Sequence, residues 1–201
     1  MAATNRRGIF SLLDVRERQG AGVWSTKGDV WNTPSPFTKI FPFGYFGGGT
    51  GPVSTVDRID YSNDTATAVE KGPLNTNVQR NSATGNSSFG YVATGHNPSL
   101  SPEYVTTVQR INYLNDIVTA LSKGPLNTGK TNAAGVGNEN FGYFVGGSPA
   151  PSAVDRIDYA NDIATASPRG NLSQSHGYTG ATGNQNFGYV GGGHDGSAIS
   201  S

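Results

Sequence analysis

The chain repeats the stretch Val-Asp-Arg-Ile-Asp-Tyr, which occupies residues 56–61. The stretch recurs with two changes at 108–113 and unchanged at 154–159. A second motif, Phe-Gly-Tyr, precedes each copy and occurs once more near the end, at 43–45, 89–91, 141–143 and 187–189. Several motifs that return in one register indicate an internal repeat, and a period of about 50 residues is typical of stacked structural units.

Each copy predicts four short β-strands. The strands centre on Ala-Thr-Gly-Asn at 83–86, on Phe-Gly-Tyr, on Val-x-Arg-Ile and on Thr-Ala-Thr-Ala at 65–68, with equivalents in the other copies. Alternation along the third strand places Val56 and Arg58 on one face and Ile59 on the other. Since both faces carry an apolar residue, we expect sheets that are covered on both sides.

The third and fourth strands are joined by an Asn-Asp pair at 63–64, 115–116 and 161–162. Asn and Asp favour a tight hairpin because their side chains bond the nearby backbone and tolerate positive φ. The same chemistry explains Asp57, Asp60, Asn63 and Asp64 better than calcium does, because their spacing differs from the EF-hand loop.

Two sets of side chains recur with the strands, and we expect structural roles for both. The arginines of the third strand are Arg58, Arg110 and Arg156, and the tyrosines of the second strand are Tyr45, Tyr91, Tyr143 and Tyr189. Each arginine is placed to pair with a carboxylate on its own sheet or on the next one.

This pattern resembles the kelch repeat, which has four strands in about 50 residues. The likeness lies in a tyrosine strand that ends in paired glycines, as in Phe46-Gly47-Gly48, followed by a Val-x-x-hydrophobic-Asp strand and a turn with proline. The resemblance covers 43–195. It implies an all-β, kelch-like propeller of about three and a half four-stranded blades, with periods that start near 43, 89 and 141 and a partial copy at 187.

The chain departs from the kelch pattern in two ways. Alanines, Ala68, Ala120 and Ala166, stand near the place of the usual fourth-strand tryptophan. The second copy has Ala93-Thr94-Gly95 where a glycine pair is expected. Packing between blades is therefore expected to be thinner than usual.

The amino-acid sequence of the repeats also resembles that of structural proteins of tailed bacteriophages of marine cyanobacteria. The likeness lies in Gly-Tyr-Phe-Gly-Gly-Gly at 44–49, in the stretch 57–68 and in the opening Arg6-Arg7-Gly8-Ile9-Phe10-Ser11-Leu12. It implies a non-enzymatic virion protein, tail- or fibre-associated, that is assembled in the host cytoplasm, and no signal peptide is visible. Two alternatives stay open: a capsid decoration or neck protein, and a lectin-like propeller that binds surface glycan.

Residues 1–42 lie outside the repeat and are expected to form an extended arm with a short helix over 12–19, capped by Ser11. Six basic and three acidic residues fall within 1–43, and both tryptophans of the chain lie here. Candidate docking residues are Arg6, Arg7, Phe10, Leu13, Trp24 and Trp31, since Arg and Trp often anchor interfaces. The arm is expected to dock on another virion protein, with packing on its own propeller as the alternative. Residues 196–201 form a short tail.

Catalytic motifs are absent from the sequence. It has no cysteine, which excludes disulfides, Cys-ligated zinc and thiol catalysis. Its three histidines lack a metal-binding spacing, and no nucleophile elbow or phosphate loop occurs. We therefore expect no enzyme, no cofactor and no metal. Zero net charge and the lack of a long apolar run favour neither nucleic-acid binding nor membrane insertion.

The second copy carries six extra residues in the loop after Thr94. His96, Asn97 and Tyr104 of this loop are candidates for contact with a host-surface glycan, although a solvated loop is the plainer interpretation.

Three full periods and a partial fourth leave the closure of a propeller open, because propellers use four to eight blades. We expect chains to combine, two of them giving a ring of about six or seven blades, or neighbouring proteins to cover the ends. A small ring closed by one chain is the alternative.

Overall fold

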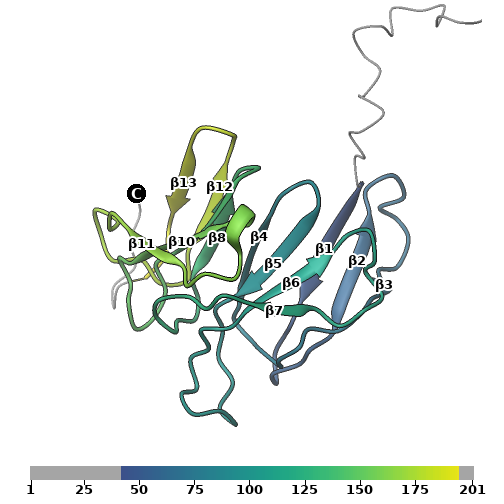
Figure 1. Ribbon diagram of the computed structural model, residues 1–201, viewed down its shortest axis with the longest axis horizontal. Helices are drawn as coiled ribbons and strands as arrows, with labels where there is room; N and C mark the ends of the chain where they lie inside the picture. Colours follow the sequence, from purple (N-terminus) through teal and green to yellow (C-terminus); the bar gives the residue numbers. More distant parts are fainter. Residues whose placement is uncertain (1–41, 195–201) are drawn as a thin grey trace, which may run out of the picture. The chain divides into compact units, whose positions relative to one another are not determined.

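The computed structural model describes residues 42–194 of the compact unit Phe41–Ser201. The predicted arm, its helix and its docking residues lie outside the described residues, as does the tail at 196–201. Strands and turns make up almost all of the described part, with one 3-10 turn at Tyr159–Asn161 (Figure 1). The prediction of an all-β fold is confirmed.

Thirteen strands between residues 42 and 194 form four antiparallel sheets, and each sheet keeps its strands in chain order. The first sheet contains β1 (Phe43–Gly47), β2 (Val56–Asp60) and β3 (Val69–Glu70). The second contains β4 (Ser82–Gly85), β5 (Phe89–Ala93), β6 (Val108–Asn112) and β7 (Leu121–Lys123). The third contains β8 (Ala134–Gly137), β9 (Phe141–Val145), β10 (Val154–Asp158) and β11 (Ser167–Arg169), and the fourth is the hairpin of β12 (Gly180–Gly183) and β13 (Gly188–Gly191).

Register ties the sequence repeat to the sheets. The Phe-Gly-Tyr strand pairs with the Val-x-Arg-Ile strand so that Tyr45 lies opposite Arg58, and the next two sheets repeat this pairing. In each of the three sheets the arginine also lies over the phenylalanine ring of the same pair of strands, about 4 Å from its centroid. The arginines are thereby held in one orientation along the sheet.

The fourth strand occupies only part of its predicted stretch. The sequence predicts a strand on Thr-Ala-Thr-Ala and its neighbours, and β3, β7 and β11 lie on the residues that directly follow this motif and its equivalents. The reason is visible at Ala120, whose N–H donates to the carbonyl of Pro73, just after the last strand of the preceding sheet, at 2.8 Å. Ala166 donates to Pro125 in the same way. The motif therefore joins two sheets instead of extending one.

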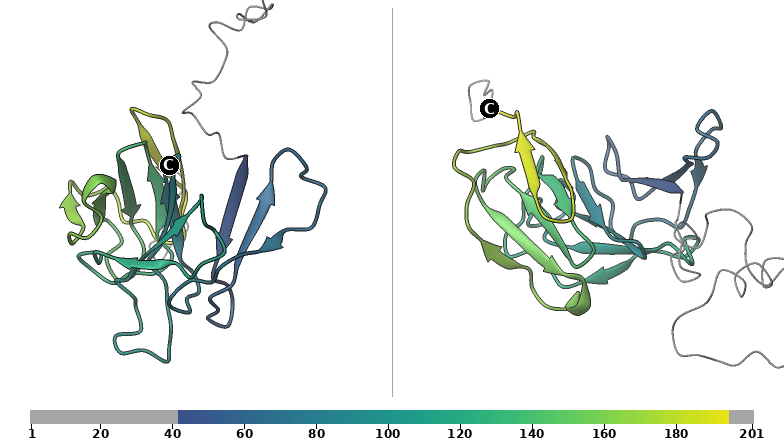
Figure 2. Two further views of the ribbon diagram at one scale, coloured as in Figure 1. Left: turned by 45° about the vertical axis from the view of Figure 1, so that its right-hand side comes forward. Right: turned by 90° about the horizontal axis from the view of Figure 1, so that it is seen from above.

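The sheets pack face to face in chain order (Figure 2). A cluster of Val56, Leu74, Val92, Ile111 and other buried residues fills the space between the first and second sheets. Equivalent residues, among them Val108, Leu126, Phe144 and Ile157, fill the space between the second and third. The second sheet contributes to both clusters, as the two-sided alternation of its third strand predicts.

The two ends of this array are incomplete. Among residues 42–194, the first sheet has no counterpart of β4 and β8, and the last hairpin has counterparts of β4 and β5 alone. Among the described residues, no strand pairing joins the last hairpin to the first sheet. The sheets thus form an open array.

Two glycines show how closely consecutive sheets approach. A Cβ placed on Gly72 would collide with the carbonyl oxygen of Val118, and one on Gly124 with that of Ala164. Their N–H groups donate to the carbonyls of Asp116 and Asp162 at 2.8 Å. Only glycine lets the backbones of two sheets meet in this way.

Replacing Gly124 by alanine is expected to lower the free energy of unfolding by about 2–3 kcal/mol, because the methyl group forces the second and third sheets apart. Gly180→Ala is the control, since a Cβ there meets nothing within 4 Å and the third sheet carries Ala134 at the equivalent position. Urea unfolding of both variants measures the difference, and equal losses would contradict the close approach.

Candidate functional site

One polar contact recurs between consecutive sheets. Asp116, in the β6–β7 hairpin of the second sheet, accepts a hydrogen bond from the Tyr45 hydroxyl at 3.0 Å and one from Arg58 at 2.7 Å. Lys71 lies 3.4 Å from its other oxygen. We call this arrangement a carboxylate clamp: a Tyr, an Arg and a Lys of one sheet around the hairpin Asp of the next.

The same clamp joins the second and third sheets. Asp162 accepts from Tyr91 at 3.0 Å and from Arg110 at 2.7 Å, and Lys123 lies 3.1 Å away. Both aspartates are buried. A buried carboxylate needs such partners, because an unpaired charge is costly away from water.

Protonation in the clamp follows from these contacts. Burial by itself raises the pKa of Asp116, but the hydrogen bond from Tyr45 and the charges of Arg58 and Lys71 hold it below its ordinary value of 3.8. Burial and the bond to Asp116 raise the pKa of Tyr45 to about 12. Burial likewise raises the pKa of Tyr91 far above its ordinary value. The tyrosines therefore stay neutral donors and the carboxylate stays charged near neutral pH.

The hairpin aspartates were expected to serve their own turns, and this interpretation was wrong for Asp116 and Asp162. The turns are closed by a different side chain, the last residue of the third strand. Asp60 accepts from the N–H of Ser62, Asn112 from Leu114 and Asp158 from Ala160, at 2.8–3.0 Å. The second residue of the Asn-Asp pair is thus free to reach the preceding sheet.

Aromatic and amide side chains add to the contact. Tyr45 stacks on Tyr113 of the next sheet with centroids 4.8 Å apart, and Tyr91 stacks on Tyr159 at 4.7 Å. The asparagine of Ala-Thr-Gly-Asn caps the following turn and donates to the next sheet. Asn86 reaches the carbonyl of Glu139 at 3.3 Å, and Asn138 that of Gln185 at 3.2 Å.

The donor half of a third clamp stands at the end of the array. Tyr143, Arg156 and Arg169 occupy the positions of Tyr45, Arg58 and Lys71 in the third sheet. Arg156 lies over Phe141, 4.2 Å from its centroid, as its counterparts do. Within residues 42–194 no carboxylate pairs with Arg156 or Arg169, and the Tyr143 hydroxyl makes no hydrogen bond.

The acceptor half stands at the other end. Asp64 occupies the position of Asp116 and Asp162 in the hairpin of the first sheet, and it is exposed. It makes no ion pair or side-chain hydrogen bond with the rest of the described chain. Of the predicted structural residues, Arg58, Arg110, Tyr45 and Tyr91 therefore lie in complete clamps, and Arg156 and Tyr143 in an incomplete one. Tyr189, on β13, is 61% exposed.

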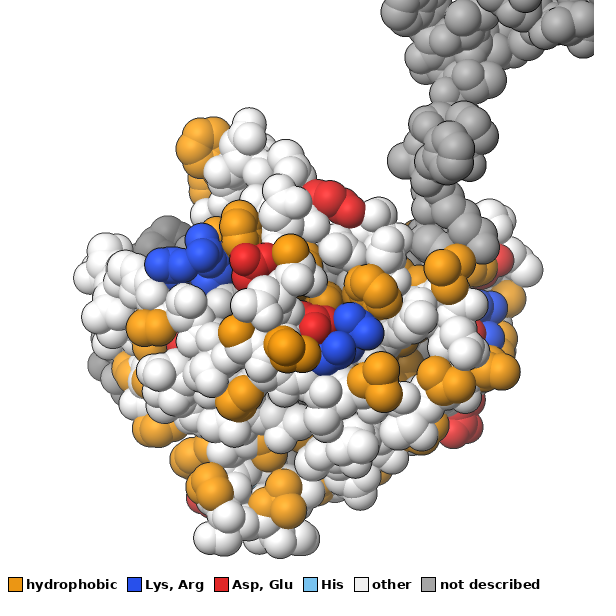
Figure 3. Space-filling view, viewed as in Figure 1, with side chains coloured by type: hydrophobic (Ala, Val, Ile, Leu, Met, Phe, Trp, Pro, Cys, Tyr) orange, Lys and Arg blue, Asp and Glu red, His pale blue; other side chains and the backbone are white. Residues whose placement is uncertain are grey.

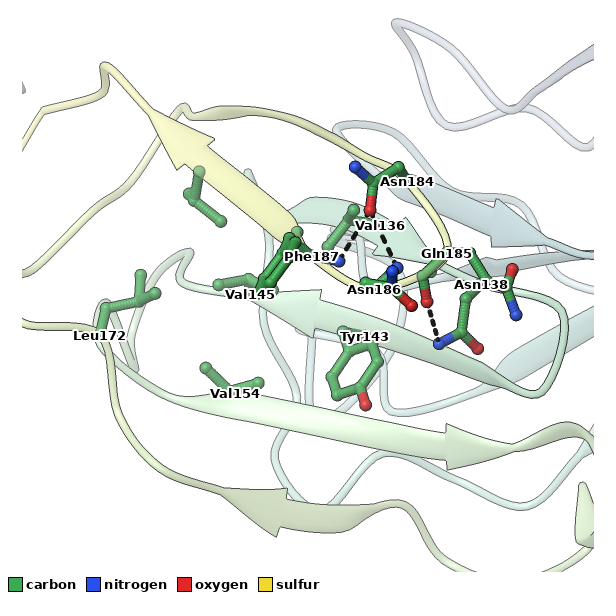
Figure 4. Close-up of a pocket in the computed structure, with 13 residues that line it drawn as sticks. Val136, Asn138, Tyr143, Val145, Val154, Leu172, Asn184, Gln185, Asn186 and Phe187 are labelled. Atoms are coloured by element: carbon green, nitrogen blue, oxygen red, sulfur yellow. Dashed lines mark hydrogen bonds between the residues drawn. The ribbon is translucent and has the colours of Figure 1, made fainter.

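A cavity of about 260 Å³ lies beside the incomplete clamp (Figure 4). Tyr143, Val145, Val154 and Leu172 line it from the third sheet, and Phe187 and Val190 come from the last hairpin. In the first complete interface the equivalents Val56 and Leu74 belong to the buried cluster, and Tyr45 packs against it. The cavity is therefore the half of an inter-sheet core that a further sheet would fill.

The loop after Thr94 keeps its predicted binding residues occupied. The His96 ring contacts the amide of Gln79 at 2.9 Å and the carboxylate of Glu103 at 3.2 Å, and it lies 5.7 Å from the Tyr104 ring. Asn97 is buried and donates to the carbonyl of Asn77 at 2.9 Å. These side chains hold the loop to the segment that joins β3 and β4.

Other functional groups are sparse in the described part of the chain. No cluster of three or more His, Cys, Asp or Glu side chains that could hold a metal occurs between residues 42 and 194. The same residues include no helix that could span a membrane. On the face shown in Figure 3, hydrophobic side chains are scattered among polar ones.

No family model and no curated protein matches this chain. Among solved structures, that of YjhT superposes on 81% of the chain with a TM-score of 0.63 and 10% sequence identity. The chain spans 58% of the length of YjhT. At this identity the similarity concerns the fold alone, and it is consistent with a β-rich, propeller-like arrangement of the sheets.

Asp162→Asn is expected to lower the free energy of unfolding by about 2–4 kcal/mol, because it leaves the charges of Arg110 and Lys123 without their carboxylate. Asp158→Asn is the matched control, since Asn112 closes the equivalent turn, and it should change stability by less than about 0.5 kcal/mol. Chemical denaturation of both variants tests the clamp. A loss no larger than the control's would refute it.

The clamp also makes the free energy of unfolding depend on pH. Because the pKa of Asp116 is lower in the folded than in the unfolded chain, its contribution is full above the unfolded value and disappears as pH falls through the folded one. The stability difference between the wild type and Asp116→Asn should therefore shrink from about pH 6 to about pH 3. A difference that stays constant over this range would mean that charge plays no part.

Proposed function

We propose that this chain is a non-enzymatic structural protein of a phage particle, associated with the tail or its fibres. In this proposal the sheets are kelch-like propeller blades, the N-terminal arm docks on the particle, and the repeats present a surface for assembly or host contact. The resemblance of the repeats to phage structural proteins supports the location. The sequence likeness to kelch repeats and the face-to-face packing of the sheets support the blades.

The observation that carries the structural role is the use made of the recurring polar residues. In the first two described repeats, the Tyr, Arg and Lys that recur on the strands bind the next sheet: Tyr45, Arg58 and Lys71 bind Asp116, and their counterparts bind Asp162. These residues thus recur because they join neighbouring sheets, and their recurrence does not indicate a catalytic site. This pattern favours a scaffold over an enzyme.

The lectin-like alternative receives less support. His96 and Asn97, which we considered for glycan contact, are bonded to Gln79, Glu103 and Asn77. A glycan array on the full chain separates the two functions. Binding of a defined glycan that Tyr104→Ala abolishes would favour the lectin, whereas the scaffold proposal expects no glycan binding that depends on Tyr104.

The docking role of the arm leads to a direct prediction. A chain without residues 1–42 should stay soluble and β-rich but fail to enter particles, and Trp24→Ala or Trp31→Ala should weaken docking by about 2 kcal/mol if either tryptophan is an anchor. Quantification of the labelled chain in purified particles measures this, with removal of residues 196–201 as the control. Undiminished incorporation of the arm-less chain would contradict the proposal. Imaging of the label distinguishes tail from capsid or neck.

A further inference from the structure

The two ends of the sheet array carry complementary halves of one contact. Within residues 42–194, the third sheet presents Tyr143, Arg156 and Arg169 without a carboxylate, and the first sheet presents Asp64 without donors. We propose that a second copy of this chain docks head to tail, so that Asp64 of one copy completes the clamp on the third sheet of the other. The inference rests on the blade architecture of the proposed function and adds to it the partner and the contact.

The complete interfaces within the chain serve as templates for this contact. In each of them one carboxylate lies 2.7 Å from an arginine and 3.0 Å from a tyrosine hydroxyl of the preceding sheet. Arg156 already has the orientation of Arg58 and Arg110, since all three lie over the phenylalanine of their own sheet. The donors are thus in place before the acceptor arrives, which lowers the cost of association.

Backbone packing independently indicates the same partner. Gly72 and Gly124 lie against the hairpin of the next sheet so closely that no Cβ fits, and each N–H donates to the hairpin aspartate's carbonyl. Gly170 is their counterpart in the third sheet, and a Cβ there would meet nothing within 4 Å. A glycine thus stands at this position although nothing in the described part of the chain requires one. The hairpin of a second copy would supply the missing backbone.

Apolar surface at the two ends also matches. On the third sheet, the cavity walls Tyr143, Val154 and Leu172 correspond to the buried residues Tyr91, Val108 and Leu126. On the first sheet, Phe46 and Tyr61 are each 61% exposed. Their counterparts at the next interface, Phe144 and Tyr159, pack on the second sheet. Docking would therefore bury one incomplete core against the other.

This docking requires the displacement of one strand, because β13 of one copy and β1 of the second copy occupy the same position in the repeat. β1 is bound firmly: Tyr45 donates to Asp116 and stacks on Tyr113. On β13, by contrast, Tyr189 is 61% exposed, and Phe187 just before it is 63% exposed. We therefore expect β13 to be displaced, so that β12 pairs with the β1 of the second copy.

This exchange fixes the number of copies. With β12 from one chain and β1, β2 and β3 from the other, each chain accounts for three complete four-stranded sheets. Two copies then form a ring of about six sheets, within the four to eight blades that propellers use, whereas three copies would exceed that range.

Sedimentation of the full chain tests the association. The wild type should have twice the 20.9 kDa mass of one chain, and Asp64→Asn or Arg156→Gln should raise the dissociation constant at least about tenfold. Asp60→Asn is the matched control, because Asn112 holds its place in the second sheet, and it should leave the constant unchanged. A monomeric wild type, or a dimer indifferent to Asp64→Asn, would overturn the proposal.

A disulfide trap tests the register. Ser122 bonds Asn75 across the first complete interface at 3.2 Å, and the equivalent pair across the proposed one is Glu70 with Ser173 of the other copy. Since the chain has no cysteine, the double variant Glu70→Cys, Ser173→Cys should give a covalent dimer under oxidation. Asn75→Cys with Ser122→Cys should give a cross-linked monomer and is the positive control.

The outcomes of the trap are distinct. A monomer cross-linked between positions 70 and 173 would mean that a chain closes on itself, and the absence of a cross-link would mean that this register does not occur. Either result refutes a second copy as the occupant. Dimers that fail to enter particles would refute the proposed function but not the head-to-tail dimer. Monomers that enter particles would refute the dimer but not the proposed function.

Discussion

The packing of the sheets depends on one contact, in which a buried aspartate of one sheet binds a Tyr, an Arg and a Lys of the sheet before it. Asp116 and Asp162 are buried, so each must find its partners or be costly. Their partners come from the Phe-Gly-Tyr strand, the Val-x-Arg-Ile strand and the end of the fourth strand of the preceding sheet. One contact thereby involves three of the segments that repeat, and it explains why these motifs return together.

The clamp has a direction, and the direction orders the sheets. Each sheet gives donors to the sheet that follows and receives them from the sheet that precedes. Stability in such an array is approximately a sum of terms within sheets and terms between neighbours. A buried ion pair adds little net free energy compared with an apolar pair of the same size, but a mismatched one is expensive. The clamp therefore contributes mainly to which faces meet, while Val56, Leu74 and Ile111 supply apolar burial.

Sequence alone predicted the all-β fold and the two-sided sheets, because periodic alternation reports which faces are covered. It also suggested that the arginines pair with carboxylates on their own or the next sheet, which holds for Arg58 and Arg110. It could not choose which aspartate is the partner. Asp60 and Asp64 look alike as turn residues, and only the path of the hairpin shows that Asp60 closes the turn while Asp116 and Asp162 face another sheet.

The same limit applies to the fourth strand and to the ends. Thr-Ala-Thr-Ala has the composition of a strand. The N–H of Ala120, however, donates to the carbonyl of Pro73 of the preceding repeat. This hydrogen bond depends on how the repeats pack, which local propensity does not predict. The motifs in the sequence show three full periods and a partial fourth. That the two ends of the array are complementary follows only from the contacts of the clamps in the structure. Because the contact is directional and the described sheets do not close on themselves, residues 42–194 leave one acceptor unused at one end and one set of donors at the other. Because Asp64 and Arg156 have opposite charge, like ends repel and unlike ends attract, which favours head-to-tail assembly over any symmetric pairing of identical ends.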